Sequence, residues 1–172
     1  MILSPLEPED LELLYTIEND PTLWSVGSAN VPYSRYALRD YIATQRHDIF
    51  ADKQVRLVAR VEEDAAAAQP AKAVGLVDLF NFSPEHLRAE AGLAILQAER
   101  GKGYGRQALR LLTEYARRVL RLHSIYAVVA EDNAASLALF RAAGFTYEQR
   151  LKDWISRPDG AWSDAVFLQM TL

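Results

Sequence analysis

The feature that most constrains this chain is a run of alternating glycines, Arg100-Gly101-Lys102-Gly103-Tyr104-Gly105, between an apolar segment and an amphipathic one. Glycine has no Cβ atom, so three glycines at alternate positions leave the backbone bare where a strand would turn into a helix. The N–H groups of such a turn can converge on one anion, and the start of the helix adds a partial positive charge. The run therefore predicts a binding site for a pyrophosphate group.

The spacing of the glycines excludes two widespread phosphate-binding loops. A dinucleotide-binding turn needs Gly-x-Gly-x-x-Gly, and a P-loop needs Gly-Lys followed by Ser or Thr. Here Lys102 is followed by Gly103. The side chains of Arg100, Lys102 and Arg106, the last just inside the predicted helix, place positive charge around the same turn.

A second motif lies further along the chain. The segment 124–130 (SIYAVVA) is predicted to be a buried strand, and Asn133 follows it closely. An Asn in this place is typical of a residue that caps the start of a helix. The short apolar helix expected after it contains Ser136 and Phe140 and ends at Gly144-Phe145.

Together the two motifs resemble the signature of the GNAT superfamily of N-acetyltransferases. That signature combines an [Arg/Gln]-x-x-Gly-x-[Gly/Ala] loop with a strand ending in an Asn, which caps a short helix closed by Gly-Phe. The resemblance covers essentially the whole chain. It is nearest to the branch of bacterial spermidine/spermine and ribosomal-protein N-acetyltransferases, through the segments 5–11 (PLEPEDL), 87–90 (LRAE) and 100–103 (RGKG).

The resemblance implies acetyl-CoA as co-substrate, with its pyrophosphate at the glycine run and its pantetheine arm between splayed fourth and fifth strands. The residues implied for the pyrophosphate are Arg100, Gly101, Lys102, Gly103, Tyr104, Gly105 and Arg106. Those implied for the pantetheine arm are Ile95 and Leu96, through their main chain, and Asn133, Ser136 and Phe140. For Asn133, capping of the helix is an open alternative, and for Ile95 and Leu96 packing within the sheet is compatible with main-chain binding.

Acetyl transfer from a thioester to an amine requires that the protonated amine lose a proton, so a base is expected near the acceptor. Glu90, in an otherwise apolar strand, is the first candidate, and Asp78, within 74–80 (VGLVDLF), is the second. A carboxylate in such surroundings needs a partner or a raised pKa. Two alternatives stay open: Asp78 binds the substrate cation instead, or each carboxylate points to solvent or pairs with an arginine such as Arg88.

The chain departs from the family pattern at the residue that would protonate the departing thiolate. Family members that use an acid usually place Tyr where this chain has Phe140. The proton must then come from Ser136, from a tyrosine elsewhere or from water. Three activities stay open: N-acetylation of a primary amine such as a polyamine, N-terminal acetylation of a protein or peptide, and CoA-binding regulation without turnover.

Composition narrows the class of protein further. A formal net charge of −4 argues against a nucleic-acid partner, and no stretch reads as a membrane span or a secretion signal. Because the chain has no cysteine and its histidines (His47, His86 and His123) are scattered, no metal site is expected. We expect a cytoplasmic homo-oligomer, a dimer or higher, that binds acetyl-CoA and a small amine or peptide.

The pattern of apolar residues predicts one α+β domain over residues 1–172. Strands are expected at 2–6, 54–62, 72–80, 88–96, 124–130, 146–155 and 161–172, and helices from Pro8, from Ser34, after the glycine run and after Asn133. Residues 22–33 are expected to be irregular, 63–70 to form a lengthened turn and 81–87 a loop. The resemblance implies a GNAT fold, in which about four helices flank a central, mostly antiparallel mixed sheet with splayed fourth and fifth strands.

Overall fold

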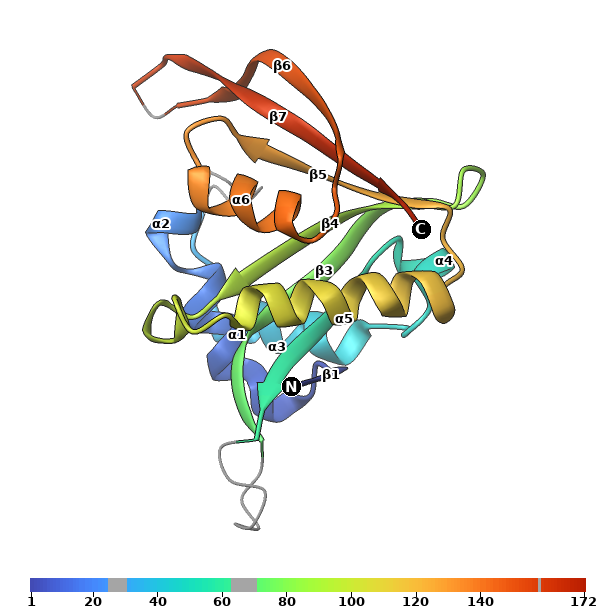
Figure 1. The fold of residues 1–172 in the computed structure, drawn as a ribbon. Coiled ribbons are helices and arrows are strands. Elements are labelled where there is room, and N and C mark those ends of the chain that lie inside the picture. Colours follow the sequence, from blue (N-terminus) through green and yellow to red (C-terminus); the bar gives the residue numbers. More distant parts are fainter. Residues whose placement is uncertain (25–30, 63–70, 158) are drawn as a thin grey trace.

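The computed structural model of the protein describes residues 1–24, 31–62, 71–157 and 159–172. They form one seven-stranded sheet in the order β1-β2-β3-β4-β5-β7-β6 (Figure 1). The strands are β1 (Ile2–Pro5), β2 (Val55–Val61), β3 (Lys72–Ser83), β4 (Arg88–Ile95), β5 (Ser124–Ala130), β6 (Tyr147–Ser156) and β7 (Trp162–Thr171). Neighbouring strands are antiparallel except β4 and β5, which are parallel. The predicted mixed sheet is confirmed.

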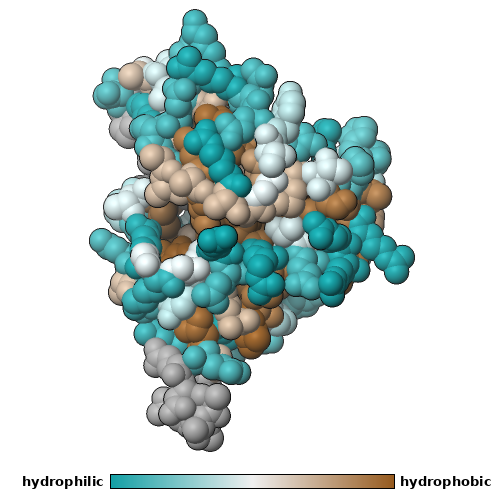
Figure 2. Space-filling view, viewed as in Figure 1, coloured by the Kyte–Doolittle hydropathy of each residue, from teal (hydrophilic) through white to brown (hydrophobic). Residues whose placement is uncertain are grey.

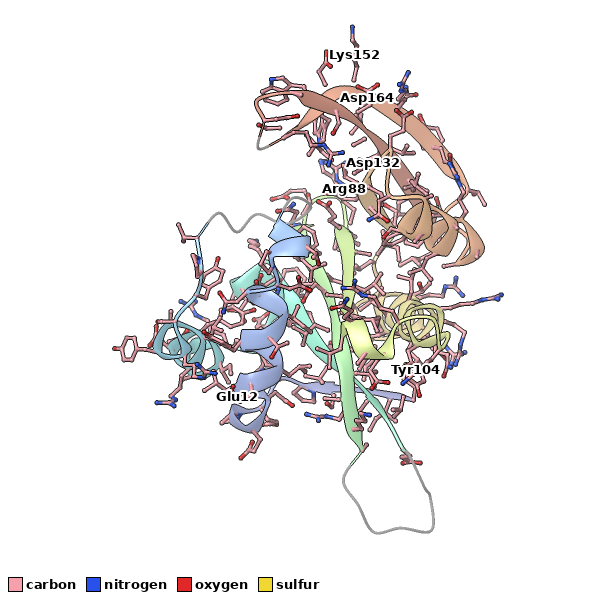
Figure 3. The ribbon with its side chains drawn as sticks, turned by 90° about the vertical axis from the view of Figure 1, so that its left-hand side faces the viewer. Glu12, Arg88, Tyr104, Asp132, Lys152 and Asp164 are labelled. Carbon is pink, nitrogen blue, oxygen red and sulfur yellow. The ribbon has the colours of Figure 1, made fainter. Side chains whose placement is uncertain are left out.

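Helices cover both faces of this sheet. They are α1 (Leu11–Glu18), α2 (Pro21–Trp24), α3 (Arg35–Thr44), α4 (Ile49–Asp52), α5 (Tyr104–Arg118) and α6 (Ala134–Ala142), with 3-10 turns η1 (Pro8–Asp10) and η2 (Gln97–Glu99). Figure 3 shows the sheet with α1 and α3 on one side and α5 on the other. We call these sides the α1/α3 face and the α5 face.

Each face has its own core. On the α5 face, Ala108, Leu109, Leu112 and Ala116 lie at helical spacing and pack in the larger core. On the α1/α3 face, a smaller core joins Leu6, which follows β1, and residues of α1 and α3 to the sheet: Leu6, Leu14, Ile17, Leu38, Ile42, Val58 and Leu76. Alternation along a strand therefore tells which face each side chain meets.

The fourth and fifth strands separate shortly after they meet. β4 pairs with β5 only at Arg88, Ala89 and Glu90, which oppose Ser124, Ile125 and Tyr126. Beyond this point β4 continues along β3 as far as Ile95, and β5 continues along β7 as far as Ala130. The splay that the resemblance implied is therefore present, and it opens immediately after Glu90.

The structure corrects two predicted segments and adds two short helices, α2 and α4, to the four that were expected. Residues 22–33 are not irregular throughout, because α2 occupies Pro21–Trp24, and residues 25–30 lie outside the described residues. Residues 81–87 are not all loop, because β3 continues to Ser83 across an irregularity in its register. The four-residue helix α4 was not predicted; Asp48 caps it by accepting a hydrogen bond from the Phe50 amide. The lengthened turn predicted at 63–70 also lies outside the described residues.

Candidate active site

The glycine run forms the turn that begins α5. Gly101 and Gly103 have φ angles of 78° and 80°, in the left-handed region that favours glycine. A Cβ atom built on either glycine would meet no atom within 4 Å, so the space beside the turn is open. Gly103 is the N-cap residue of α5 and offers no capping side chain to the first helical amides. An open turn lined by amide donors fits a diphosphate group.

The cations of the turn differ in how far they are engaged. Glu99, whose side chain is only 8% exposed, accepts hydrogen bonds or ion pairs from Lys102 at 2.9 Å and Lys72 at 3.0 Å. The hydrogen bond from Lys102, followed by that from Lys72, holds the pKa of the Glu99 carboxyl below its usual range. Arg106 is exposed and makes no ion pair with any described residue. Of these cations, Arg106 is the best placed to meet an incoming phosphate.

Two other residues of the run face the protein rather than open space. A Cβ atom on Gly105 would lie 3.4 Å from both Leu139 Cδ2 and Leu93 Cδ1, so glycine here lets α5 approach β4 and α6 closely. Tyr104 is half-buried and packs against the larger core. Their side-chain positions thus serve packing, while their amides belong to the open first turn.

The two residues predicted to bind pantetheine through their main chain differ sharply. The Leu96 amide donates to Val74 O at 3.0 Å, and its carbonyl accepts from the Glu99 amide at 2.8 Å. This geometry argues against Leu96 as a main-chain ligand, because both its groups are already used. Successive residues of an antiparallel strand direct their N–H and C=O groups to opposite edges of the strand. The Leu96 amide points to β3, so the Ile95 amide points to the other edge, toward the gap between β4 and β5. The Ile95 carbonyl accepts from Arg100 Nε at 3.0 Å, which ties the turn to the end of β4.

The three residues predicted on α6 lie in different surroundings. Asn133 caps α6, since its Oδ1 accepts from the Ser136 amide at 3.1 Å. The side chain of Ser136 is half-buried one turn above it. Phe140 is only 4% exposed and packs edge-on against Phe145, with ring centroids 5.0 Å apart. The structure thus places Phe140 in the core, whereas Asn133 and Ser136 are only half-buried.

Glu90 occupies the mouth of the splay. It is the last β4 residue paired with β5, and its neighbours Ala89 and Ala91 belong to the α5 core, so its side chain is on the α1/α3 face. Burial raises the pKa of the Glu90 carboxyl above its usual range, opposed by hydrogen bonds from Asn81, from the Val128 backbone and from Tyr126. No described Lys or Arg forms an ion pair with it. A half-buried carboxylate without a cationic partner can accept a proton from an ammonium.

Asp78 is on the same face but is already paired. Arg56 Nε and Nη2 donate to its two oxygens at 2.7 and 3.2 Å, and Arg56 Nη1 donates to Glu18 at 2.5 Å. The side chains of the three residues are 20–22% exposed. The predicted pairing with an arginine is therefore present for Asp78, but the partner is Arg56 and not Arg88. A carboxylate held by a guanidinium is a poorer base than an unpaired one.

Three residues of this site were absent from the sequence-based prediction. Asn81 donates from Nδ2 to Glu90 Oε2 at 3.0 Å, and Tyr126 faces Glu90 across the β4–β5 pair. Arg56 is the third. A polar residue inside an apolar strand was the available signal for Asn81 and Arg56, but the sequence did not identify their partners.

The described residues contain neither a metal-binding group of side chains nor a membrane-spanning helix. In the described part of the chain, no group of three or more His, Asp or Glu side chains is arranged to hold a metal ion. None of the described helices has the length and hydrophobicity needed to cross a membrane. In the view of Figure 2, hydrophobic surface gathers between the β6–β7 hairpin and α5, with hydrophilic residues around it.

Known proteins share this fold and sequence pattern. Residues 1–146 match the family model described as an acetyltransferase (GNAT) domain. The spermidine N(1)-acetyltransferase of Escherichia coli K12 is 29% identical over 150 residues, covering 87% of this chain and 74% of that protein. The crystal structure of spermidine N-acetyltransferase from Vibrio cholerae in complex with CoA and spermine superimposes with a TM-score of 0.81 at 26% identity, covering 99% and 94% of the two chains. An L-methionine sulfoximine/L-methionine sulfone acetyltransferase of Pseudomonas aeruginosa is 35% identical over 83 residues, 48% of this chain and 47% of that protein.

Proposed function

The chain belongs to the acetyltransferase (GNAT) domain family, and from this premise we propose that it transfers an acetyl group to a primary amine of a polyamine such as spermidine. Membership makes it an N-acetyltransferase with acetyl-CoA as donor. The polyamine acceptor is supported by the two spermidine N-acetyltransferases that share most of their length with this chain. The observation that carries the proposal is Glu90, a half-buried carboxylate at the mouth of the β4–β5 splay that forms no ion pair with a described residue.

The donor side of the proposed site is built from main chain. The first amides of α5 (Tyr104, Gly105 and Arg106) and the Arg106 guanidinium would hold the pyrophosphate. The Ile95 amide, at the open edge of β4, would bind the pantetheine arm in the manner of a further strand. When bound, acetyl-CoA supplies the activated acetyl thioester, and this geometry directs that thioester into the splay.

The acceptor side is proposed to bind an ammonium and remove its proton. A primary amine has a pKa near that of lysine, about 10.4, so at neutral pH almost all of it is protonated and unreactive. Glu90 accepts the proton, and the neutral amine can then attack the thioester carbonyl. Because Phe140 has no proton to give, the proton for the leaving thiol is assigned to Ser136 or to water. Asp78 and Glu18, both bound to Arg56, are carboxylates on the α1/α3 face near which a second ammonium of the same acceptor could lie.

The experiment is an acceptor panel at fixed acetyl-CoA, followed by release of free thiol. The acceptors are spermidine, spermine, putrescine, methionine sulfone and peptides with free N-termini. We expect kcat/KM for the best polyamine to exceed that of methionine sulfone and the peptides by at least about tenfold, or about 1.4 kcal/mol of transition-state stabilisation. Turnover with a peptide or amino acid but with no polyamine would refute the acceptor assignment. Tight binding of acetyl-CoA with no turnover on any acceptor would favour a regulatory CoA-binding role.

We also propose that the chain works in the cytoplasm as a homo-oligomer. Support for assembly comes from large aromatic side chains on the β6–β7 hairpin: Tyr147, Trp154 and Trp162 are each 58–61% exposed. Exposed aromatic residues grouped on one element favour a protein contact. Light scattering on the protein and on a Trp154→Ser, Trp162→Ser variant tests this, with a monomeric wild-type protein as the contrary result.

A further inference from the structure

The inference concerns Asn81, which lies at the irregularity of β3. The β3–β4 register shifts between Phe80 and Ser83, and Asn81 has a φ angle of 51°. Asparagine tolerates this left-handed backbone better than most residues with a side chain. Such irregularities locally turn a strand and change the direction of a side chain.

The parity of the strand shows that this turn changes the direction of Asn81. Phe80 is the cross-strand partner of Glu90, so in a regular strand residue 81 would point to the opposite face from Glu90. Yet Asn81 Nδ2 donates to Glu90 Oε2 at 3.0 Å. Phe82 belongs to the α5 core together with Leu79, which regular alternation would not allow. The bulge therefore re-aims residue 81 toward the Glu90 carboxylate.

We propose that Asn81 is the positioning residue of the base: its amide fixes Oε2 of Glu90 in place, while the carboxylate keeps further lone pairs that can accept from the substrate ammonium. This inference rests on the proposed role of Glu90 as the base. A neutral donor holds a carboxylate without supplying the positive charge that Arg56 supplies to Asp78 on the same face. The Asn81–Glu90 hydrogen bond also stabilises the charged form, and so opposes the rise in the Glu90 pKa that burial causes.

Other charged and titratable groups around Glu90 are few. From β5, Tyr126 faces Glu90, and its own pKa is raised by burial and then by the Glu90 charge. Arg88 lies two residues earlier on β4, and its positive charge opposes the rise in the Tyr126 pKa. On β3, Asp78 lies two residues before Phe80, the cross-strand partner of Glu90, and is paired with Arg56. Asn81 is thus a group whose removal changes the Glu90 environment without breaking any ion pair between described residues.

Two substitutions isolate the amide from the backbone. Asn81→Gly permits the left-handed backbone and removes the donor, and Asn81→Asp keeps the shape but places a second carboxylate beside Glu90. The readout is the acid limb of the pH profile of kcat/KM with spermidine. Because the rate requires ionised Glu90, a raised pKa moves this limb to higher pH. We expect a shift of about half a unit for Asn81→Gly and of one unit or more for Asn81→Asp.

The matched control is Asp153→Gly. Asp153 also has a positive φ, 50°, at a register shift, but it lies in the β6–β7 hairpin away from Glu90. This variant should leave the acid limb and the affinity for acetyl-CoA unchanged, whatever it costs in melting temperature. An unchanged acid limb in both folded Asn81 variants overturns the proposal.

A second measurement keeps the two hypotheses apart. The titration of the Glu90 carboxyl carbon can be followed by NMR without turnover, with Glu90→Gln to assign the signal. We expect its pKa to rise in the order wild type, Asn81→Gly, Asn81→Asp. A rise in this order, together with a wild-type protein that acetylates no amine, shows that Asn81 controls the Glu90 carboxyl but rejects the proposed function, and with it the role of Asn81 as positioning residue of a base. Identical titrations in all three proteins reject the Asn81 inference even if acetylation is confirmed.

Discussion

On the α5 face, the groups proposed to hold the pyrophosphate are consecutive main-chain amides at the start of one helix, with the Arg106 guanidinium beside them. On the α1/α3 face, they are side chains from four separate elements: Glu18 of α1, Arg56 of β2, Asp78 of β3 and Glu90 of β4. A main-chain site depends on backbone shape, which glycine permits, and tolerates changes in most neighbouring side chains. A side-chain site depends on charge balance, so the change of one residue affects its partners. The predictions below test this difference.

The largest expected effect is on the α1/α3 face, in Glu90→Gln. This change keeps the shape of the side chain and removes the base, so turnover near neutral pH should fall by roughly 10²-fold or more. The deficit should shrink as pH rises, because free amine then becomes available. The pH–rate profile with the best acceptor measures both effects. Asp78→Asn is the comparison variant: it should mainly raise the KM for the amine, and a deficit that closes with pH in this variant instead would transfer the role of base to Asp78.

Arg56→Met tests how strongly the charges on this face depend on one another. It leaves Asp78 and Glu18 without their shared guanidinium, and we expect it to lower the free energy of unfolding by about 2–3 kcal/mol. The matched control is Arg35→Met, which breaks the exposed Arg35–Glu12 pair and should lower the free energy of unfolding far less than Arg56→Met does, because water screens that pair. Denaturant unfolding gives both values. Equal losses in the two variants would mean that burial adds nothing to the Arg56 network.

Gly103→Val addresses the main-chain site. A side chain in the open turn would occupy the space proposed for the pyrophosphate, so we expect acetyl-CoA affinity to fall at least about tenfold, or about 1.4 kcal/mol. The control is Gly160→Val, because Gly160 has a similar φ of 83° and a Cβ there also meets no atom within 4 Å. Both variants carry similar backbone strain, but only the first should lose affinity in calorimetric titration. Undiminished affinity in a folded Gly103→Val protein would end the assignment of the pyrophosphate turn.

The smallest effect is expected at Phe140. Since its ring is buried beside Phe145, Phe140→Tyr should lower stability by only about 1 kcal/mol and keep turnover at or above the wild-type value. Thermal melting and steady-state kinetics measure the two quantities. A large loss of turnover in a stable Phe140→Tyr protein would show that the ring lines the reaction site more closely than its burial indicates.

Local chemistry made much of the fold predictable. Ser34 was predicted to cap a helix, and its Oγ accepts from the Ala37 amide at 3.1 Å. The glycine turn and the buried face of α5 were likewise predictable from the sequence, because both depend on residues within a few positions of one another. The same holds for Asn133, whose capping bond to Ser136 spans three residues.

Non-local chemistry was not predictable in the same way. Arg56 meets Asp78 and Glu18 across sequence separations of 22 and 38 residues, and no local pattern specifies such partners. The bulge at Asn81 was read as a loop because a left-handed residue interrupts the alternation on which strand prediction depends. Leu96 was predicted as the last residue of its strand, but β4 ends at Ile95, and the hydrogen bonds of Leu96 to Val74 and Glu99 depend on the ladder register and on η2.

The short contact between β4 and β5 has a mechanical consequence. The strands β1 to β4 and β5 to β7 form two half-sheets, and within the described residues they are joined directly by one short ladder, the pairing of Arg88–Glu90 with Ser124–Tyr126. A pantetheine arm seated along the open edge of β4 would then bridge the halves, so that the cofactor becomes a structural member of the protein that consumes it. Binding and release of the cofactor in each catalytic cycle would stiffen and relax the junction between β4 and β5. Slow hydrogen exchange of the amides along the facing edges of β4 and β5 would then report the fraction of time that the cofactor is bound.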